Sequence, residues 1–240
     1  MRAHRVRCLL MGGQACVLYG AAEFSRDVDL AILIDPDNLT QLERALAELQ
    51  AERAAVPPFT GAYLARGHAV HFRANHRDAA GIRIDLMAVM RGGAAFPALW
   101  ERRTTVETPD GDVLEVMALP DLVQAKKTQR DKDWPMIRRL LEADYFGHRT
   151  KPSSEQIDFW LRELRTALLL IECAHAHRAE AVRLSTERAL LASALAAEED
   201  DLVASLSGEE AAERARDREY WKSLRAELEA LRREEPRARG

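Results

Sequence analysis

The sequence predicts an α/β (α+β) fold: a mixed β-sheet flanked by helices, followed by an all-helical C-terminal part. Short aliphatic and β-branched runs alternate with helical segments up to about Pro120. From Pro120 onward, apolar residues recur at helical spacing. Hydrophobic residues make up 47% and charged residues 31% of the 240 residues, as in ordinary globular chains. We therefore expect two domains, residues 1–150 and a helical domain over residues 151–240.

Five runs in the first part have the aliphatic composition of strands. They span residues 6–11, 28–34, 69–73, 82–89 and 113–117. Between the first two runs, residues 14–19 predict a short helix that ends at Gly20. A longer helix is predicted over residues 39–52, where leucines recur at helical spacing behind Asn38 as the N-cap.

Two capping boxes predict helix starts in the C-terminal part. Ser153 begins the sequence Ser-Ser-Glu-Gln, and Ser207 begins Ser-Gly-Glu-Glu. After Ser153, an apolar stripe predicts a helical face; its members are Ile157, Leu161, Leu164, Leu168 and Ile171. The acidic residues 198–201 are interpreted as a solvated loop between helices.

Composition and missing motifs exclude several classes of protein. The net charge of −4 gives no global basic field for a nucleic-acid coat or a membrane-surface protein. The three cysteines form no CxxC pair and no apolar run could span a bilayer, so we expect a cytoplasmic protein with no membrane partner. The sequence contains neither a P-loop nor a G-x-S-x-G elbow, and its histidines have no zinc-ligand spacing.

Carboxylates on two predicted strands point to a metal-dependent site. Asp27 and Asp29 lie two residues apart on a strand, so both side chains belong to one face. Asp85 shares a face with Arg83 on another otherwise apolar strand. Neighbouring carboxylates repel each other, and a divalent cation with oxygen ligands, Mg²⁺ or Mn²⁺, relieves that repulsion. A simple ion pair between Asp85 and Arg83 is the alternative interpretation.

The pair Gly12-Gly13, the Asp27-x-Asp29 motif and Asp85 resemble the signature of the polymerase-β-like nucleotidyltransferase superfamily. The sequence is most similar to its small bacterial branch, which includes the aminoglycoside and lincosamide nucleotidyltransferases and the AbiEii-type toxin enzymes. A second similarity spans residues 119–126 and 130–133, and the whole resemblance covers roughly residues 6–145. Two positions depart from the pattern: Glu23 stands where many relatives carry arginine, and Ser25 replaces a threonine.

The resemblance implies a role for each matching residue. Asp27, Asp29 and Asp85 would be the catalytic residues and the metal ligands, with Asp85 as a ligand or general base. Nucleotide binding would fall to the remaining matched positions, which are Gly12, Gly13, Ser25, Arg83, Lys126 and Asp133. For Lys126 and Lys127, a solvated helix face is the alternative interpretation. The cofactor would be Mg²⁺ or Mn²⁺.

The function implied is transfer of a nucleoside monophosphate from a nucleoside triphosphate such as ATP to an acceptor hydroxyl, with release of pyrophosphate. The acceptor stays open between a small molecule, as in antibiotic resistance, and a tRNA or protein, as in toxin–antitoxin systems. A homodimer or a cognate antitoxin would be the protein partner. The alternative is a non-catalytic protein on the same fold that binds a nucleotide or a partner.

Overall fold

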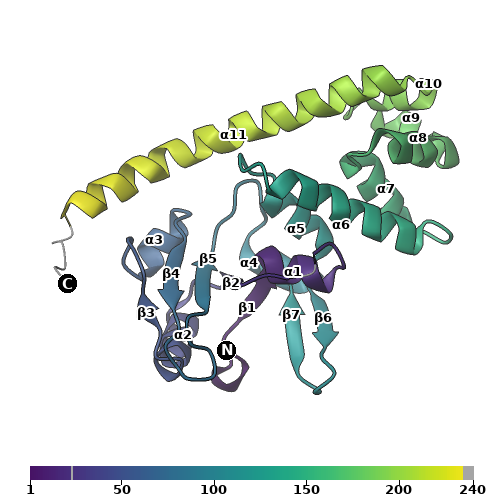
Figure 1. The fold of residues 1–240 in the computed structure, drawn as a ribbon. Helices are drawn as coiled ribbons and strands as arrows, with labels where there is room; N and C mark the ends of the chain where they lie inside the picture. Colours follow the sequence, from purple (N-terminus) through teal and green to yellow (C-terminus); the bar gives the residue numbers. More distant parts are fainter. Residues whose placement is uncertain (23, 235–240) are drawn as a thin grey trace. The chain divides into compact units, whose positions relative to one another are not determined.

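A computed structural model describes residues 1–22 and 24–234 of the chain (Figure 1). In these residues the fold is mixed α/β, as predicted, with one seven-stranded mixed sheet in the order β3-β4-β5-β2-β1-β7-β6. The strands are β1 (Cys8–Met11), β2 (Asp27–Ile32), β3 (Glu52–Arg53), β4 (Val70–Arg73), β5 (Arg83–Met87), β6 (Thr104–Glu107) and β7 (Val113–Val116). All five predicted strands occur, with ends that differ by no more than one or two residues.

The chain divides into two compact units. Of the described residues, the sheet unit comprises Met1–Leu18, Ala22–Ala125 and residues 219–234, and the helical unit comprises Tyr19–Ala21 and Lys126–Arg218. The sheet unit holds all seven strands with the helices α1 (Gly12–Leu18), α2 (Pro36–Glu48), α3 (Gly61–Ala65), α4 (Phe96–Arg102) and most of α5 (Leu119–Lys126). The functional boundary at residue 150 stays a prediction.

Side-chain alternation gives the central strands β2, β5 and β4 two different faces. One face is apolar and packs with α2 and α3 into a core that includes Leu30, Ile84, Phe72, Leu42 and Leu64. The intervening residues of the same strands belong to the opposite face, which carries the polar side chains. Burial of the apolar face therefore fixes the register that orders the polar one.

The prediction that Asn38 caps the helix α2 is wrong. Asp35 is the N-cap, and its side chain accepts a hydrogen bond from the Asn38 amide over 2.9 Å. Asn38 is buried instead, where its side chain pairs with both backbone groups of Arg7 and with the carbonyl of Leu33. It thus ties the residue before β1 to the residue after β2. The helix ends at Glu48, earlier than predicted.

The helical unit contains α6 (Asp133–His148), α7 (Ser154–Glu163), α8 (Ala167–Ala176), α9 (Arg178–Leu184), α10 (Leu191–Ala196) and the first part of α11 (Glu199–Glu234). The capping box at Ser153 is confirmed, since Ser153 and Gln156 exchange side-chain-to-backbone hydrogen bonds. The apolar stripe that follows is split between α7 and α8, and Leu168 is 60% exposed. The single helical face predicted there is therefore wrong.

Two further predictions in the C-terminal part are corrected by α11. Ser207 does not start a helix, because it lies inside α11, where its hydroxyl donates to the Val203 carbonyl over 2.9 Å. Three of the acidic residues predicted as a loop, Glu199, Asp200 and Asp201, form the first turn of this helix. Their charges complement the positive end of the helix dipole. No helix in the described part of the chain is long and apolar enough to cross a membrane.

Candidate functional site

The polar face of the sheet aligns the predicted carboxylates. β2 and β5 run parallel, and their register places Asp29 directly beside Asp85 and Asp27 beside Arg83. β4 runs antiparallel to β5 on the other side and places His71 beside Asp85. Neighbouring strands lie about 4.8 Å apart, so these side chains form two adjacent rows on one face. The structure therefore brings Asp27, Asp29 and Asp85 onto the same surface.

Asp85 is held by two basic side chains. Its Oδ1 accepts a hydrogen bond from Arg83 Nε at 2.7 Å, and His71 Nδ1 lies at 2.7 Å from the same oxygen. Burial raises the pKa of Asp85, but the hydrogen bonds from His71 and Arg83 outweigh this effect and leave the pKa below its usual value. Asp85 is consequently ionised at neutral pH, and the predicted pair with Arg83 is present.

The two glycines give the site its closest packing. Gly12 has a φ of +67°, and a Cβ built on it would lie 1.8 Å from Asp29 Oδ2. A Cβ on Gly13 would lie 2.3 Å from Ser25 Oγ. No other residue type fits these positions without displacing Asp29 or Ser25. The glycine pair is therefore needed for the position of both side chains, a reason independent of any ligand.

The loop that carries Ser25 is held from α1. Gln14 Nε2 donates to the Ser25 carbonyl at 2.7 Å, and the Ser25 hydroxyl donates to the Asp27 carbonyl at 3.3 Å. Phe24, directly before Ser25, is 73% exposed. Glu23, which departs from the family pattern, lies outside the described residues. Ser25 is thus anchored through its backbone beside an exposed aromatic ring.

Lys126 and Asp133 belong to the helical unit and lie together there. Lys126 Nζ is 3.6 Å from Asp133 Oδ1. The other carboxylate oxygen of Asp133 accepts from Thr128 Oγ1 at 2.5 Å and from Arg130 Nε at 2.7 Å. α5 ends at Lys126 and α6 begins at Asp133, so Asp133 closes the connection between two helices. The interpretation of Lys127 as part of a solvated face is wrong, since Lys127 is buried and paired with Glu163.

The donor chemistry of the polar face partly fits a divalent cation. Asp27 and Asp29 supply carboxylate oxygens, the ligands that Mg²⁺ and Mn²⁺ prefer. Asp85 would have to share its carboxylate with Arg83 and His71. Among the described residues, no group of three or more His, Cys, Asp and Glu side chains is placed to hold a metal ion. Asp27 and Asp29 are therefore the candidate ligands, and Asp85 fits as a neighbour of that pair.

Three residues of this site were not among the sequence predictions: His71, Gln14 and Phe24. His71 lies on a predicted strand at the alternating position that faces Asp85, but this follows only from the β4–β5 register. Gln14 acts through a backbone carbonyl, which leaves no sequence signal. Phe24 could have been noticed as an aromatic residue in a polar loop. No protein-family model matches the chain, and comparison with curated proteins finds no match.

Proposed function

We propose that the chain is a metal-dependent nucleotidyltransferase that moves a nucleoside monophosphate from a nucleoside triphosphate to an acceptor hydroxyl. The observation that carries this proposal is the presence of three carboxylates on one face of the sheet. Asp27 and Asp29 on β2 and Asp85 on β5 occupy one polar face, and the Gly12-Gly13 pair holds Asp29 and Ser25 against α1. The core is formed by the opposite face of the same strands, so none of these carboxylates belongs to it.

Asp27 and Asp29 would hold Mg²⁺ or Mn²⁺, which would neutralise the phosphate charge of the bound nucleotide. The chain itself supplies the remaining parts of the site. Ser25 and the backbone at Gly13 can donate hydrogen bonds to phosphate oxygens. Phe24 offers an exposed ring on which a base can stack. Each of these interactions positions the donor nucleotide rather than forming a bond with it.

Asp85 would orient the acceptor. The acceptor oxygen attacks the α-phosphorus, the bond from that phosphorus to the bridging oxygen breaks, and pyrophosphate leaves with the bonding electrons. The ionised Asp85 carboxylate can accept a hydrogen bond from the acceptor hydroxyl, direct its oxygen towards phosphorus and take up the proton that the hydroxyl loses. Arg83 and His71 keep Asp85 in place for this task. Positioning and charge neutralisation supply most of the acceleration in phosphoryl-type transfer.

One observation favours a second candidate function, a non-catalytic protein that binds a nucleotide or a protein partner. Asp85 is already paired with two basic side chains, as a carboxylate with a purely structural role would be. In that case Asp85 would orient no acceptor, and turnover would not depend on it. If the chain is an enzyme, its acceptor is a small molecule, a tRNA or a protein, and a screen of these three classes identifies it.

Calorimetric titration with each of the four nucleoside triphosphates, first with Mg²⁺ and then with EDTA, tests the proposal. We expect binding of at least one nucleotide that requires the metal and is lost in the Asp27→Asn, Asp29→Asn double variant. Asp110 and Asp112 have the same spacing in the exposed turn between β6 and β7, so Asp110→Asn, Asp112→Asn is the matched control. Absence of nucleotide binding under both conditions would exclude the proposed function.

Asp85→Asn separates the two candidate functions. If the chain is an enzyme, this variant still binds the nucleotide but no longer releases pyrophosphate with the acceptor that the wild-type protein uses. A nucleotide-binding protein without catalytic activity forms no pyrophosphate even as wild type, when small-molecule, tRNA and protein acceptors are screened. Release of pyrophosphate is therefore the deciding measurement.

A further inference from the structure

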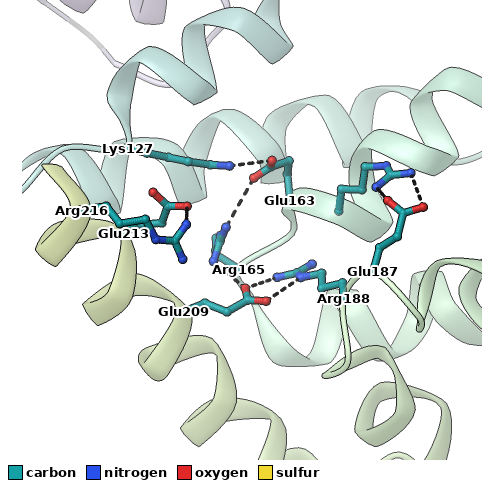
Figure 2. Close-up of a pocket in the computed structure, with 9 residues that line it drawn as sticks. Lys127, Glu163, Arg165, Glu187, Arg188, Glu209, Glu213 and Arg216 are labelled. Carbon is teal, nitrogen blue, oxygen red and sulfur yellow. Dashed lines mark hydrogen bonds and ion pairs between the residues drawn. The ribbon is translucent and has the colours of Figure 1, made fainter. Parts of the chain in front are cut away.

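The helical unit contains a pocket lined entirely by charged side chains (Figure 2). Its volume is about 300 Å³, at the lower end of the range for small-molecule sites. Five of the lining residues are basic and four are acidic: Lys127, Arg162, Arg165, Arg188, Arg216, Glu163, Glu187, Glu209 and Glu213. A pocket in which every lining residue is charged does not suit a hydrophobic ligand, so its occupant has to be sought among charged molecules.

The rim of the pocket is electrically balanced. Arg162 pairs with Glu187, and Arg216 pairs with Glu213 at 2.9 Å. Both arginines are substantially exposed, at 40% and 63% of their side-chain surface. An ion pair with both partners exposed, such as Arg162–Glu187, contributes little to stability. Arg216 is the exposed partner of a largely buried Glu213, and its side chain reaches the solvent at the rim.

The lining of the pocket has an excess of one positive charge, since five basic side chains stand against four acidic ones. Its three most buried bases, Lys127, Arg165 and Arg188, pair with Glu163 and Glu209. These three basic side chains are 8%, 9% and 8% exposed, so water solvates their charges poorly. Figure 2 shows Arg165 between the two glutamates. A pocket whose lining carries more positive than negative charge favours an anion.

Arg165 is the basic residue whose hydrogen bonds are incomplete. Arg188, by contrast, donates to the carbonyls of Leu161 and Leu164 and to Glu209, which explains it as a structural anchor. Arg165 Nη1 donates to Glu209 at 2.8 Å, but its Nη2 is 3.4 Å from Glu163. Its Nε is buried and has no hydrogen-bond partner. A buried donor of this kind costs free energy that a ligand oxygen can recover.

We propose that this pocket binds a small phosphate-bearing molecule, with Arg165 as the central anion-binding residue. Two oxygens of the phosphate would accept from Nε and Nη2 of Arg165, which would give the buried Nε a partner and replace the long contact of Nη2 with Glu163. The guanidinium group suits this role because its planar fork matches the oxygens of a phosphate. Arg216, at the rim, would turn from Glu213 to a third oxygen. The volume accommodates a phosphate monoester of a small metabolite.

Calorimetric titration of the full chain with inorganic phosphate, against chloride at equal ionic strength, is the first test. We expect saturable binding of phosphate and a matching rise in the melting temperature. Arg165→Lys keeps the charge but removes the fork, and we expect affinity to fall by about tenfold or more. Arg216→Gln is expected to weaken binding, whereas Arg218→Gln on the same helix, outside the lining, should leave it unchanged.

Two further measurements locate the bound phosphate and identify the kind of ligand. Binding must survive in the Asp27→Asn, Asp29→Asn double variant, because a phosphate bound at the candidate nucleotide site would be lost there. Tighter binding of glycerol phosphate than of inorganic phosphate would identify a monoester, and the reverse order would identify free phosphate as the ligand. The proposal is overturned if phosphate binds no better than chloride, or if Arg165→Lys and Arg216→Gln both bind as wild type does.

Discussion

Alanine at position 13 tests the tightest packing in the candidate site. A Cβ there would lie 2.3 Å from Ser25 Oγ and 2.8 Å from Ser25 Cβ. Since ordinary contacts between carbon atoms are about 3.5–4.0 Å, Ser25 would have to move by about 1 Å. Overpacking of this kind costs about 1–3 kcal/mol. The gain in helix propensity from glycine to alanine offsets at most about 1 kcal/mol. We therefore expect Gly13→Ala to lower the free energy of unfolding by up to about 3 kcal/mol.

A double-mutant cycle isolates this overlap from other effects of the substitution. Ser25→Gly removes both atoms that the new methyl group would meet. In the Ser25→Gly background, Gly13→Ala should cost about 1–3 kcal/mol less than in the wild type. The free energies of unfolding are measured by urea denaturation followed by circular dichroism. A coupling energy of zero would refute the reasoning, because the cost would then not arise from Ser25.

Three further predictions concern thiol reactivity, a buried amide and acid stability. Burial raises the pKa of the thiols to about 11 for Cys8 and about 12 for Cys173. Because the thiolate is the reactive form, both cysteines should react with a thiol reagent near pH 8 at least about a hundredfold more slowly than a free cysteine, until urea unfolds the chain. Asn38→Ala should cost about 2–4 kcal/mol in urea denaturation, because it removes three hydrogen bonds of a buried side chain, while the exposed Asn75→Ala should stay within about 0.5 kcal/mol of wild type. Burial raises the pKa of Glu209, but the nearby Arg188 and Arg165 outweigh the effect of burial and lower this pKa in the folded chain. Ionised Glu209 therefore stabilises the fold above its unfolded pKa, and this contribution is lost as the pH falls through the pKa that Glu209 has in the folded chain. In Glu209→Gln, unfolding measured from about pH 6 to about pH 3 should show a shallower loss of stability with acid; an unchanged slope would contradict this assignment.

Sequence reasoning succeeds where burial alone determines the structure. The central strands were found because their apolar residues face a core, and alternation then places Asp27 and Asp29 on one face. It misses β3 and β6, which are short edge strands with exposed or half-buried side chains. Such strands carry little hydrophobic pattern, and their pairing with a neighbour decides their conformation.

Local signals fail where tertiary packing outweighs them. Ser207 and Gly208 favour a helix start, yet both lie inside α11, where Gly208 has open space around it. Asn38 has good capping propensity, but Asp35 takes the cap and leaves Asn38 for the core. The partnership of His71 with Asp85 depends on strand register, which one sequence does not determine.

The position of Arg83 and Asp85 on one strand has a consequence for folding. Their pairing spans only two residues, whereas the parallel pairing of Asp29 with Asp85 must close a long stretch of chain. Non-local pairings of this kind form slowly, so the short-range pair has time to form first. β5 would then join β2 with its negative charge already compensated by a guanidinium. The carboxylates need never meet as a group without a cation beside them.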